Sequence, residues 1–127
     1  MSFFVVWTDS EQAKIFDFTA AGASEHIVKR RGHHPAVGHT GDIKHRDEDK
    51  FFADVATHLQ RATEILIVGP GLAKTHLKAY LEKHRAHDLG ARVVGVEAMD
   101  HPTDPEVVAF ARRFFKANHD FFFARRA

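Results

Sequence analysis

The chain has 127 residues and a mass of 14.3 kDa, a length that predicts one domain, 1–127. Lys and Arg number 18 against 17 Asp and Glu, so the net charge of +1 does not by itself point to nucleic acid. The sequence has no cysteine, which excludes disulfides, thiolate metal sites and a cysteine nucleophile.

Three short apolar segments begin the chain and are predicted to be strands: 3–8, 13–19 and 25–31. The connections between them are short, which favours antiparallel pairing of neighbours. The next segment, 32–46, has no hydrophobic periodicity and contains three glycines, one proline and four histidines. We therefore expect a long loop there, and a loop of this length in a small domain is typically functional or mobile.

The second half of the chain alternates helical and strand patterns. A helix is predicted from Asp47 to Ala62, with Asp47, Glu48 and Asp49 in its acidic first turn. Thr103 and Glu106 fit a capping box at the start of the last helix. The other predictions are strands at 64–68 and 92–98 and helices from 73 to about 86 and from 103 to about 125.

The predicted order is β-β-β-α-β-α-β-α, which is typical of an α/β fold. The strands of the second half should be parallel, because helices connect them. We expect a five-stranded mixed sheet with helices on both faces.

A glycine turn between a strand and a helix carries a family resemblance. The sequence Gly69-Pro70-Gly71-Leu72-Ala73-Lys74 follows the apolar strand and opens the second helix. Together with the element order, it resembles the ribonuclease H-like three-layer fold, and more narrowly the central domain of archaeal and eukaryotic peptide-release factors and of Pelota. The chain is also similar to bacterial single-domain relatives described as translational machinery proteins. The resemblance implies a translation-associated role with the ribosome or another RNA as partner.

One departure from this family concerns its catalytic loop. In release factors the loop before the first helix carries Gly-Gly-Gln, which positions water on the peptidyl-tRNA ester. Segment 29–46 contains no glutamine. The sequence therefore predicts a binding protein without peptidyl-tRNA hydrolase activity, more a binding module than an enzyme, with no cofactor.

The same segment is rich in cations. Lys29, Arg30, Arg31, Lys44 and Arg46 against Asp42 give a local charge of 5 − 1 = +4 before histidines, which suits the phosphate backbone of RNA. The alternative is a solvated loop without a partner. The candidate phosphate ligands are Arg30, Arg31, His33, His34, Lys44 and Arg46, with Lys74 as a helper beside the glycine turn of Gly69 and Gly71.

A metal-dependent hydrolase or nuclease is the alternative function. Imidazoles of the loop could hold an ion, although their spacing fits no established motif. Carboxylates at strand ends could hold two divalent ions, although helix capping already explains Asp47 and Asp49. The imidazole candidates are His33, His34, His39 and His45, and the carboxylate candidates are Asp9, Asp47, Asp49, Glu97 and Asp100.

Three further expectations concern location and assembly. No basic leader and no run of 18 apolar residues is present, which predicts a cytoplasmic protein without a membrane span.

Residues 121–123 are consecutive phenylalanines and cannot all face one core. They predict either a homodimer through the last helix or a helix end that folds back on the sheet. Eleven histidines also allow a pH-responsive assembly.

Overall fold

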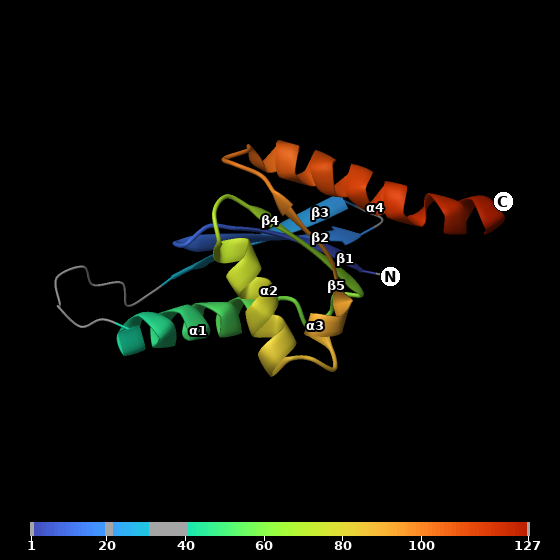
Figure 1. Cartoon of the computed structure of the whole chain (residues 1–127). Helices are drawn as coiled ribbons and strands as arrows, with labels where there is room; N and C mark the ends of the chain where they lie inside the picture. The colour runs from blue at the N-terminus through green and yellow to red at the C-terminus, as the bar shows by residue number, and fades with distance from the viewer. Residues whose placement is uncertain (1, 20–21, 31–40, 127) are drawn as a thin grey trace.

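A single mixed sheet in the strand order β3-β2-β1-β4-β5 organises the chain (Figure 1). The computed structural model describes residues 2–19, 22–30 and 41–126, and at 19, 22–23, 41–46 and 118–126 it describes the backbone alone. β1 pairs antiparallel with β2, as the sequence predicts, and parallel with β4. The strands are β1 (Phe3–Thr8), β2 (Gln12–Thr19), β3 (Gly22–Lys29), β4 (Glu64–Gly69) and β5 (Val93–Ala98).

Helices cover both faces of this sheet, which confirms the predicted α/β architecture. Figure 1 shows α1, α2 and α3 on one face and α4 on the other. In the described part of the chain no helix has both the length and the hydrophobicity to cross a membrane. The helices are α1 (Gly41–Thr57), α2 (Ala73–His84), α3 (Leu89–Arg92) and α4 (Asp104–Arg126).

The central strand β1 contributes to two hydrophobic cores. Successive side chains of a strand point to opposite faces. Phe4 and Val6 therefore pack with α1 and α2, while Val5 and Trp7 pack with α4. Because both faces are covered, β1 and β4 read in the sequence as continuous apolar runs rather than as alternating patterns.

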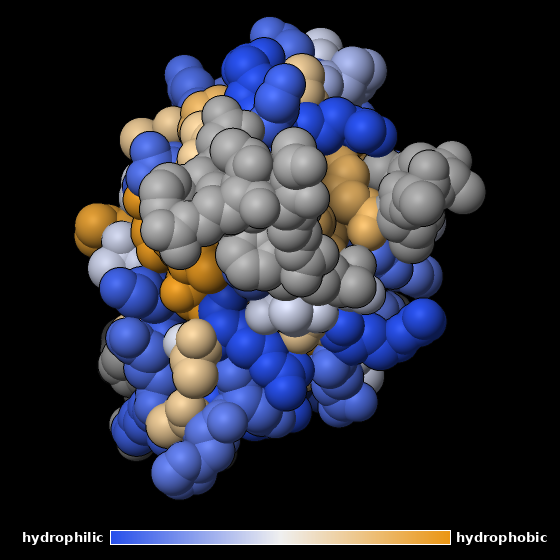
Figure 2. Space-filling view, turned by 90° about the vertical axis from the view of Figure 1, so that its right-hand side faces the viewer, coloured by the Kyte–Doolittle hydropathy of each residue, from blue (hydrophilic) through white to orange (hydrophobic). Residues whose placement is uncertain are grey.

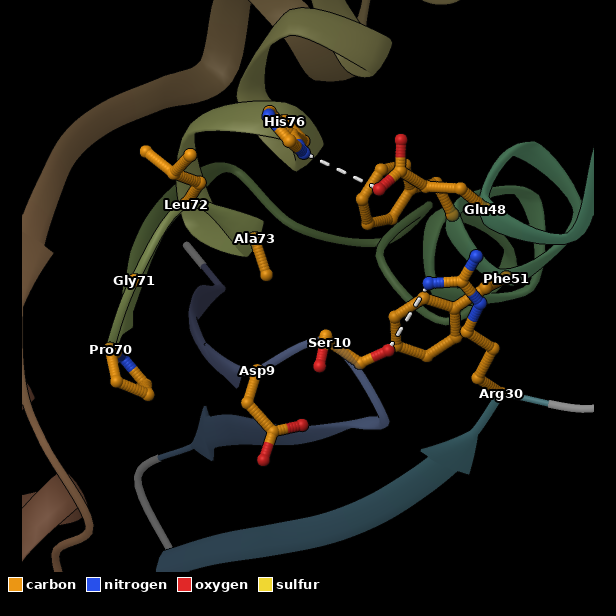
Figure 3. A pocket seen from close by; sticks show the side chains of 11 residues that line it. Asp9, Ser10, Arg30, Glu48, Phe51, Pro70, Gly71, Leu72, Ala73 and His76 are labelled. Atoms are coloured by element: carbon orange, nitrogen blue, oxygen red, sulfur yellow. Dashed lines mark hydrogen bonds and ion pairs between the residues drawn. The ribbon is translucent and has the colours of Figure 1, made fainter. Parts of the chain in front are cut away.

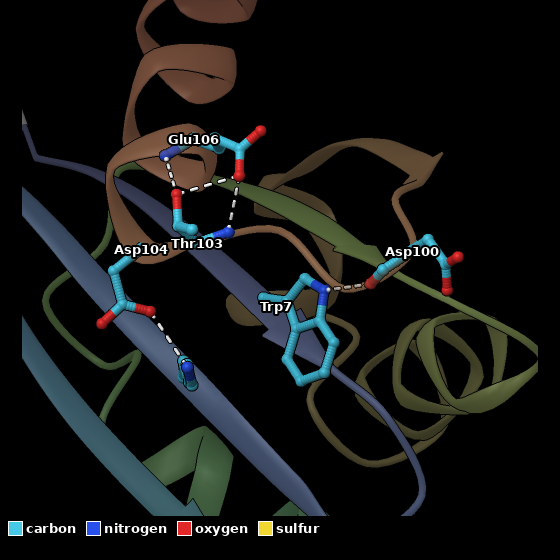
Figure 4. A network of polar contacts seen from close by, with 6 residues as sticks. Trp7, Asp100, Thr103, Asp104 and Glu106 are labelled. Atoms are coloured by element: carbon cyan, nitrogen blue, oxygen red, sulfur yellow. Dashed lines mark hydrogen bonds and ion pairs between the residues drawn. The ribbon is translucent and has the colours of Figure 1, made fainter.

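Polar contacts fix the start of α4 against the sheet (Figure 4). The predicted capping box is present: the backbone N–H of Thr103 donates to Glu106 Oε1 at 2.8 Å, and the N–H of Glu106 donates to Thr103 Oγ1 at 3.3 Å. Lys14 Nζ contacts Asp104 Oδ1 at 3.0 Å. The ion pair thereby joins β2 to the first turn of α4.

The start of α1 corrects one prediction. The helix begins at Gly41, so the expected loop 32–46 is wrong in its last six residues. Asp47 and Asp49 lie well inside the helix, and the capping explanation for them is therefore also wrong. The helix ends at Thr57 rather than at Ala62. The polar residues at 41–46 show no apolar periodicity, which hides the helix start from sequence analysis.

Other boundaries also differ from the predicted ones. β3 begins at Gly22 and ends at Lys29 instead of spanning 25–31, and α2 ends at His84. The sequence does not predict the short helix α3, because Gly90 within it is typical of the end of a connection. A methyl group at Gly90 would lie 2.8 Å from the carbonyl oxygen of Leu81, so this glycine allows α3 to pack on α2.

Few large hydrophobic side chains reach the surface in the described ranges. Figure 2 shows a face that is largely hydrophilic, with its hydrophobic areas mostly in the upper half of the view. The exposed large hydrophobic residues are Ile27, Leu72 and Val94, exposed by 51%, 68% and 41%. Each of the three lies at an edge or a turn: Ile27 on β3, Leu72 before α2 and Val94 on β5.

Removal of the Glu106 carboxylate should destabilise the protein in a pH-dependent way. The backbone N–H and hydroxyl of Thr103 lower the pKa of Glu106. A lowered pKa in the folded state stabilises the fold at neutral pH, and this contribution is lost as the pH falls through that pKa. Glu106→Ala should therefore reduce the urea midpoint at about pH 7, and the difference from wild type should shrink near about pH 2.5. Glu82→Ala, at an exposed position of α2, serves as control. The prediction would be contradicted if the urea midpoint of Glu106→Ala fell below that of wild type by the same amount at both pH values.

Candidate functional site

A hollow of about 390 Å³ lies where β1 and β4 end (Figure 3). The two strands are parallel, so their carboxyl ends meet at the same edge of the sheet. The chain leaves β1 towards β2 and leaves β4 towards α2, in opposite directions along the sheet. Such divergence opens a crevice, which is where α/β proteins commonly bind ligands. The lining residues are Asp9, Ser10, Arg30, Glu48, Phe51, Phe52, Pro70, Gly71, Leu72, Ala73 and His76.

The glycine turn brings β4 close to β1 beside this hollow. Gly69 has φ +151°, and a methyl group there would lie 2.1 Å from the carbonyl oxygen of Thr8. Gly71 has φ +59°, with nothing within 4 Å of a methyl group. The predicted tight turn between strand and helix is therefore present, and glycine is required at 69 for two reasons, conformation and contact.

The first turn of α2 forms one wall. The residue before the helix, Leu72, makes no capping hydrogen bond through its side chain, and the first turn contains no acidic residue. Lys74 Nζ donates to the carbonyl oxygen of Gly71. The lysine is thereby folded back on the turn and is not among the lining residues, so the structure gives it a structural contact rather than a place in the hollow.

Arg30 lies on the opposite wall, at the end of β3. Its backbone N–H donates to Glu11 O at 2.8 Å, and its guanidinium Nη1 donates to Ser10 O at 3.3 Å. These contacts hold Arg30 against the turn between β1 and β2. Figure 3 shows the guanidinium group between this turn and α1. The predicted phosphate ligand thus lies at the hollow, although the prediction contained no reason to expect a cavity there.

The other predicted ligands of the basic segment fall in less fully described regions. Arg31, His33, His34 and His39 lie outside the described residues. Lys44, His45 and Arg46 belong to the beginning of α1, where the backbone alone is described. The helix α1 contributes Glu48, Phe51 and Phe52 to the hollow. Lys44 and Arg46, which follow 31–40, therefore lie on a helix that lines the hollow, and Arg30, which precedes 31–40, lines it directly.

The acidic residues of the hollow are engaged in protein contacts. Asp9 Oδ1 accepts hydrogen bonds from the N–H groups of Glu11 and Gln12, at 2.8 and 2.9 Å. Glu48 Oε2 lies 3.3 Å from Nδ1 of His76, which joins α1 to α2. The first carboxylate thus stabilises a turn, and the second forms part of a helix–helix contact.

The carboxylates proposed for a nuclease centre are not assembled. Within the described ranges no three His, Cys, Asp or Glu side chains come together in a way that could hold a metal ion. Asp100 lies near His101, with Oδ1 and Nδ1 2.9 Å apart, while Asp47 lies on α1. The structure therefore gives no support to a centre built from Asp9, Asp47 and Asp100.

Sequence analysis missed Ser10, Glu48 and His76 as members of one site. They come from a turn and two helices that are far apart in the sequence. A usable signal was the parallel arrangement predicted for the second half of the chain, because it indicates a crevice at the strand ends. A shallower hollow of about 300 Å³ continues along α1 and α2 and shares Glu48, Phe52 and His76. In it, burial and the charge of Asp49 raise the pKa of Tyr80.

Comparison with solved structures shows that the fold occurs in translation factors. Archaeoglobus fulgidus Pelota matches 88% of the chain with a TM-score of 0.62 and 17% identity, and Thermoplasma acidophilum Pelota matches 87% with 0.62 and 18%. The archaeal translation termination factor aRF1 matches 96% with 0.59 and 15%. The match covers 31% of each Pelota chain and 40% of aRF1, so this chain spans about a third of the length of these structures.

No family model and no curated protein matches the chain. The predicted resemblance to the fold of Pelota and the release factors is confirmed, and with it the ribonuclease H-like arrangement of the sheet and helices. At these identities the likeness concerns the fold.

The two glycines of the turn should differ in their tolerance of alanine. Gly69→Ala forces a methyl group onto the Thr8 carbonyl in an unfavourable conformation and should cost about 3 kcal/mol or more of unfolding free energy. Gly71→Ala meets no neighbour and should cost only about 1–2 kcal/mol, the conformational term alone. Urea denaturation of both variants measures the difference. Equal losses would show that the approach of Gly69 to Thr8 does not constrain the fold.

Proposed function

We propose that this chain is a translation-associated domain that binds RNA, with the ribosome as its first candidate partner, and that it does not hydrolyse peptidyl-tRNA. The observation that carries the proposal is the match of its fold to aRF1, described as a translation termination factor, over 96% of the chain. A second match supports it: Saccharomyces cerevisiae Dom34, described as a translation termination-like factor involved in RNA quality control, has a TM-score of 0.53 and 9% identity.

The distribution of charge supports contact with RNA through segment 29–46. The whole chain has a net charge of +1, whereas this segment has +4 from its lysines and arginines. The rest of the chain therefore has a net charge of −3, although its last part, 112–126, also carries +4. Cationic groups bind RNA by neutralising phosphates and releasing counterions. Arg30, at the rim of the hollow, provides a fixed point from which this contact extends.

The proposed ligands of RNA phosphates are Arg30, Arg31, His33, His34, Lys44 and Arg46. Lys74 is a weaker candidate, because its ammonium group already donates to Gly71 O. The Gly-Gly-Gln tripeptide that the family resemblance associates with hydrolysis does not occur in segment 29–46. Binding without ester hydrolysis is therefore the activity that we propose.

Ribosome binding should depend on the charges of this segment. A variant with Arg30, Arg31, Lys44 and Arg46 changed to Gln should co-sediment with ribosomes much less than wild type. Each lost phosphate contact should also reduce the slope of log affinity against log salt by about 0.7. The measurement is co-sedimentation at two or more salt concentrations.

The matched control removes the same charge elsewhere, from exposed cations outside the segment. Its four substitutions to Gln are at Arg61, Lys83, Arg113 and Lys116. The control should sediment close to wild type at each salt concentration. Equal sedimentation of wild type and the segment variant would refute the proposed contact, and an equal loss in both variants would show that binding depends on overall charge alone.

The proposed absence of hydrolysis has a direct assay. Ribosomes carrying labelled peptidyl-tRNA should release no more peptide with this protein than with buffer, because the water-positioning glutamine is missing from the segment. A release factor serves as the positive control. Peptide release that rises with the concentration of this protein would contradict this part of the proposal while leaving ribosome binding intact.

A further inference from the structure

The outer edge of β3 is regular and faces away from the rest of the sheet. β3 pairs with β2 in one uninterrupted register from Gln12↔Lys29 to Thr19↔Gly22. The N–H of Arg30 donates to Glu11 O, which identifies residues 30 and 11 as a hydrogen-bonded pair of this ladder. Hydrogen-bonded pairs alternate along antiparallel strands, so the even-numbered residues of β3 bond to β2. The N–H and C=O groups of Glu25, Ile27 and Lys29 consequently point away from β2, to an edge that no other strand of the described residues pairs with.

The other edge of the sheet differs in a way that matters for pairing. β5 pairs with β4 through a shift of register between Ile65 and Leu66, which leaves Val94 as an extra residue. Such bulges bend an edge strand and reduce its ability to pair with another chain. β3 has no corresponding irregularity. On the side of the sheet where α1 lies, the His26 ring of β3 stacks on the His58 ring, with the ring centroids 4.9 Å apart.

The β3 edge carries an acidic, a hydrophobic and a basic side chain at alternate positions. Glu25, Ile27 and Lys29 alternate along the strand and therefore share one face, on the side of the sheet where α4 lies. Ile27 is 51% exposed. An acid and a base, both exposed, flank it symmetrically at two residues on either side.

The acidic end of this edge carries an excess of negative charge. Lys14 Nζ contacts Asp104 Oδ1 at 3.0 Å, and Glu25 lies beside the same pair. Two carboxylates thus share one ammonium group. Partial burial, followed by the interaction with Asp104, raises the pKa of Glu25. A further cation placed near Glu25 would complete the charge balance, and the chain presents one at Lys29.

We propose that β3 pairs antiparallel with β3 of a second copy of this chain, about a two-fold axis that passes through Ile27. In this register Ile27 faces its own copy, and Glu25 of each copy faces Lys29 of the other. All of these residues direct their N–H and C=O groups to the open edge, so they form the hydrogen-bonded pairs of the new ladder. The two sheets become one continuous sheet, and the charge pairs occur twice.

The properties of the edge favour a second copy as the occupant. A two-fold axis requires a self-complementary surface, in which a residue that contacts a second residue of the other copy is itself matched by the reverse contact. A central hydrophobic residue flanked by opposite charges at equal spacing meets this requirement. The shared seam is one strand wide, which is small beside a standard interface, so we expect a weak dimer with a dissociation constant on the order of micromolar or above.

Charge exchange across the seam provides the test. Glu25→Lys places Lys opposite Lys in both pairs, and Lys29→Glu places Glu opposite Glu, so each single variant should dimerise at least about tenfold more weakly than wild type. The double variant Glu25→Lys/Lys29→Glu restores opposite charges and should dimerise like wild type. An equimolar mixture of the two single variants should also dimerise, because their pairs are complementary. Sedimentation equilibrium over a range of protein concentrations measures all five samples.

Controls separate this surface from others. Far-UV circular dichroism checks that each variant is folded, and Ile27→Lys, which places two ammonium groups on the axis, should be monomeric. Phe122→Asp in the last helix should leave dimerisation unchanged. A wild type that is monomeric at every concentration, single variants that dimerise like wild type, a mixture that stays monomeric, or loss of the dimer in Phe122→Asp would each overturn the proposal. Because the test uses no RNA, its outcome is independent of the proposed function.

Discussion

The parallel pairing of β1 with β4 is the constraint on which the rest of the structure depends. Both strands are buried on both faces, so each contributes to two cores at once. At the end of this pair Gly69 approaches the Thr8 carbonyl so closely that no side chain fits between them. The turn into α2 begins at this contact, and the hollow forms beside it. The position of the candidate site therefore follows from how two apolar strands end.

The elements that could be predicted from the sequence are those that the cores determine. β1 and β4 are short apolar runs, and burial on both faces gives them that pattern. The capping box of Thr103 and Glu106 is recognisable because the two partners of its hydrogen bonds lie only three residues apart in the chain. The strand directions also follow from the connections, because short connections favour antiparallel neighbours and helical connections favour parallel strands.

The parts that escaped prediction lack such local signals. The first residues of α1 are polar and do not show the spacing of a buried helix face, so a loop was the natural interpretation. In α3, Gly90 suggested a break, although its small size serves the packing of the helix on Leu81. Arg30 is a candidate on charge alone, whereas the hollow that it lines combines a strand end, a turn and two helices, which only the tertiary structure brings together.

The environment of Trp7 has a practical consequence. This residue is the chain's single tryptophan, it is 4% exposed, and its indole N–H donates to the carbonyl oxygen of Asp100 at 3.0 Å, just ahead of α4. Its ring thus joins the central strand to the segment that leads into the last helix (Figure 4). Intrinsic fluorescence consequently offers an unlabelled optical reporter for separation of that helix from the sheet, distinguishable from events on the opposite layer.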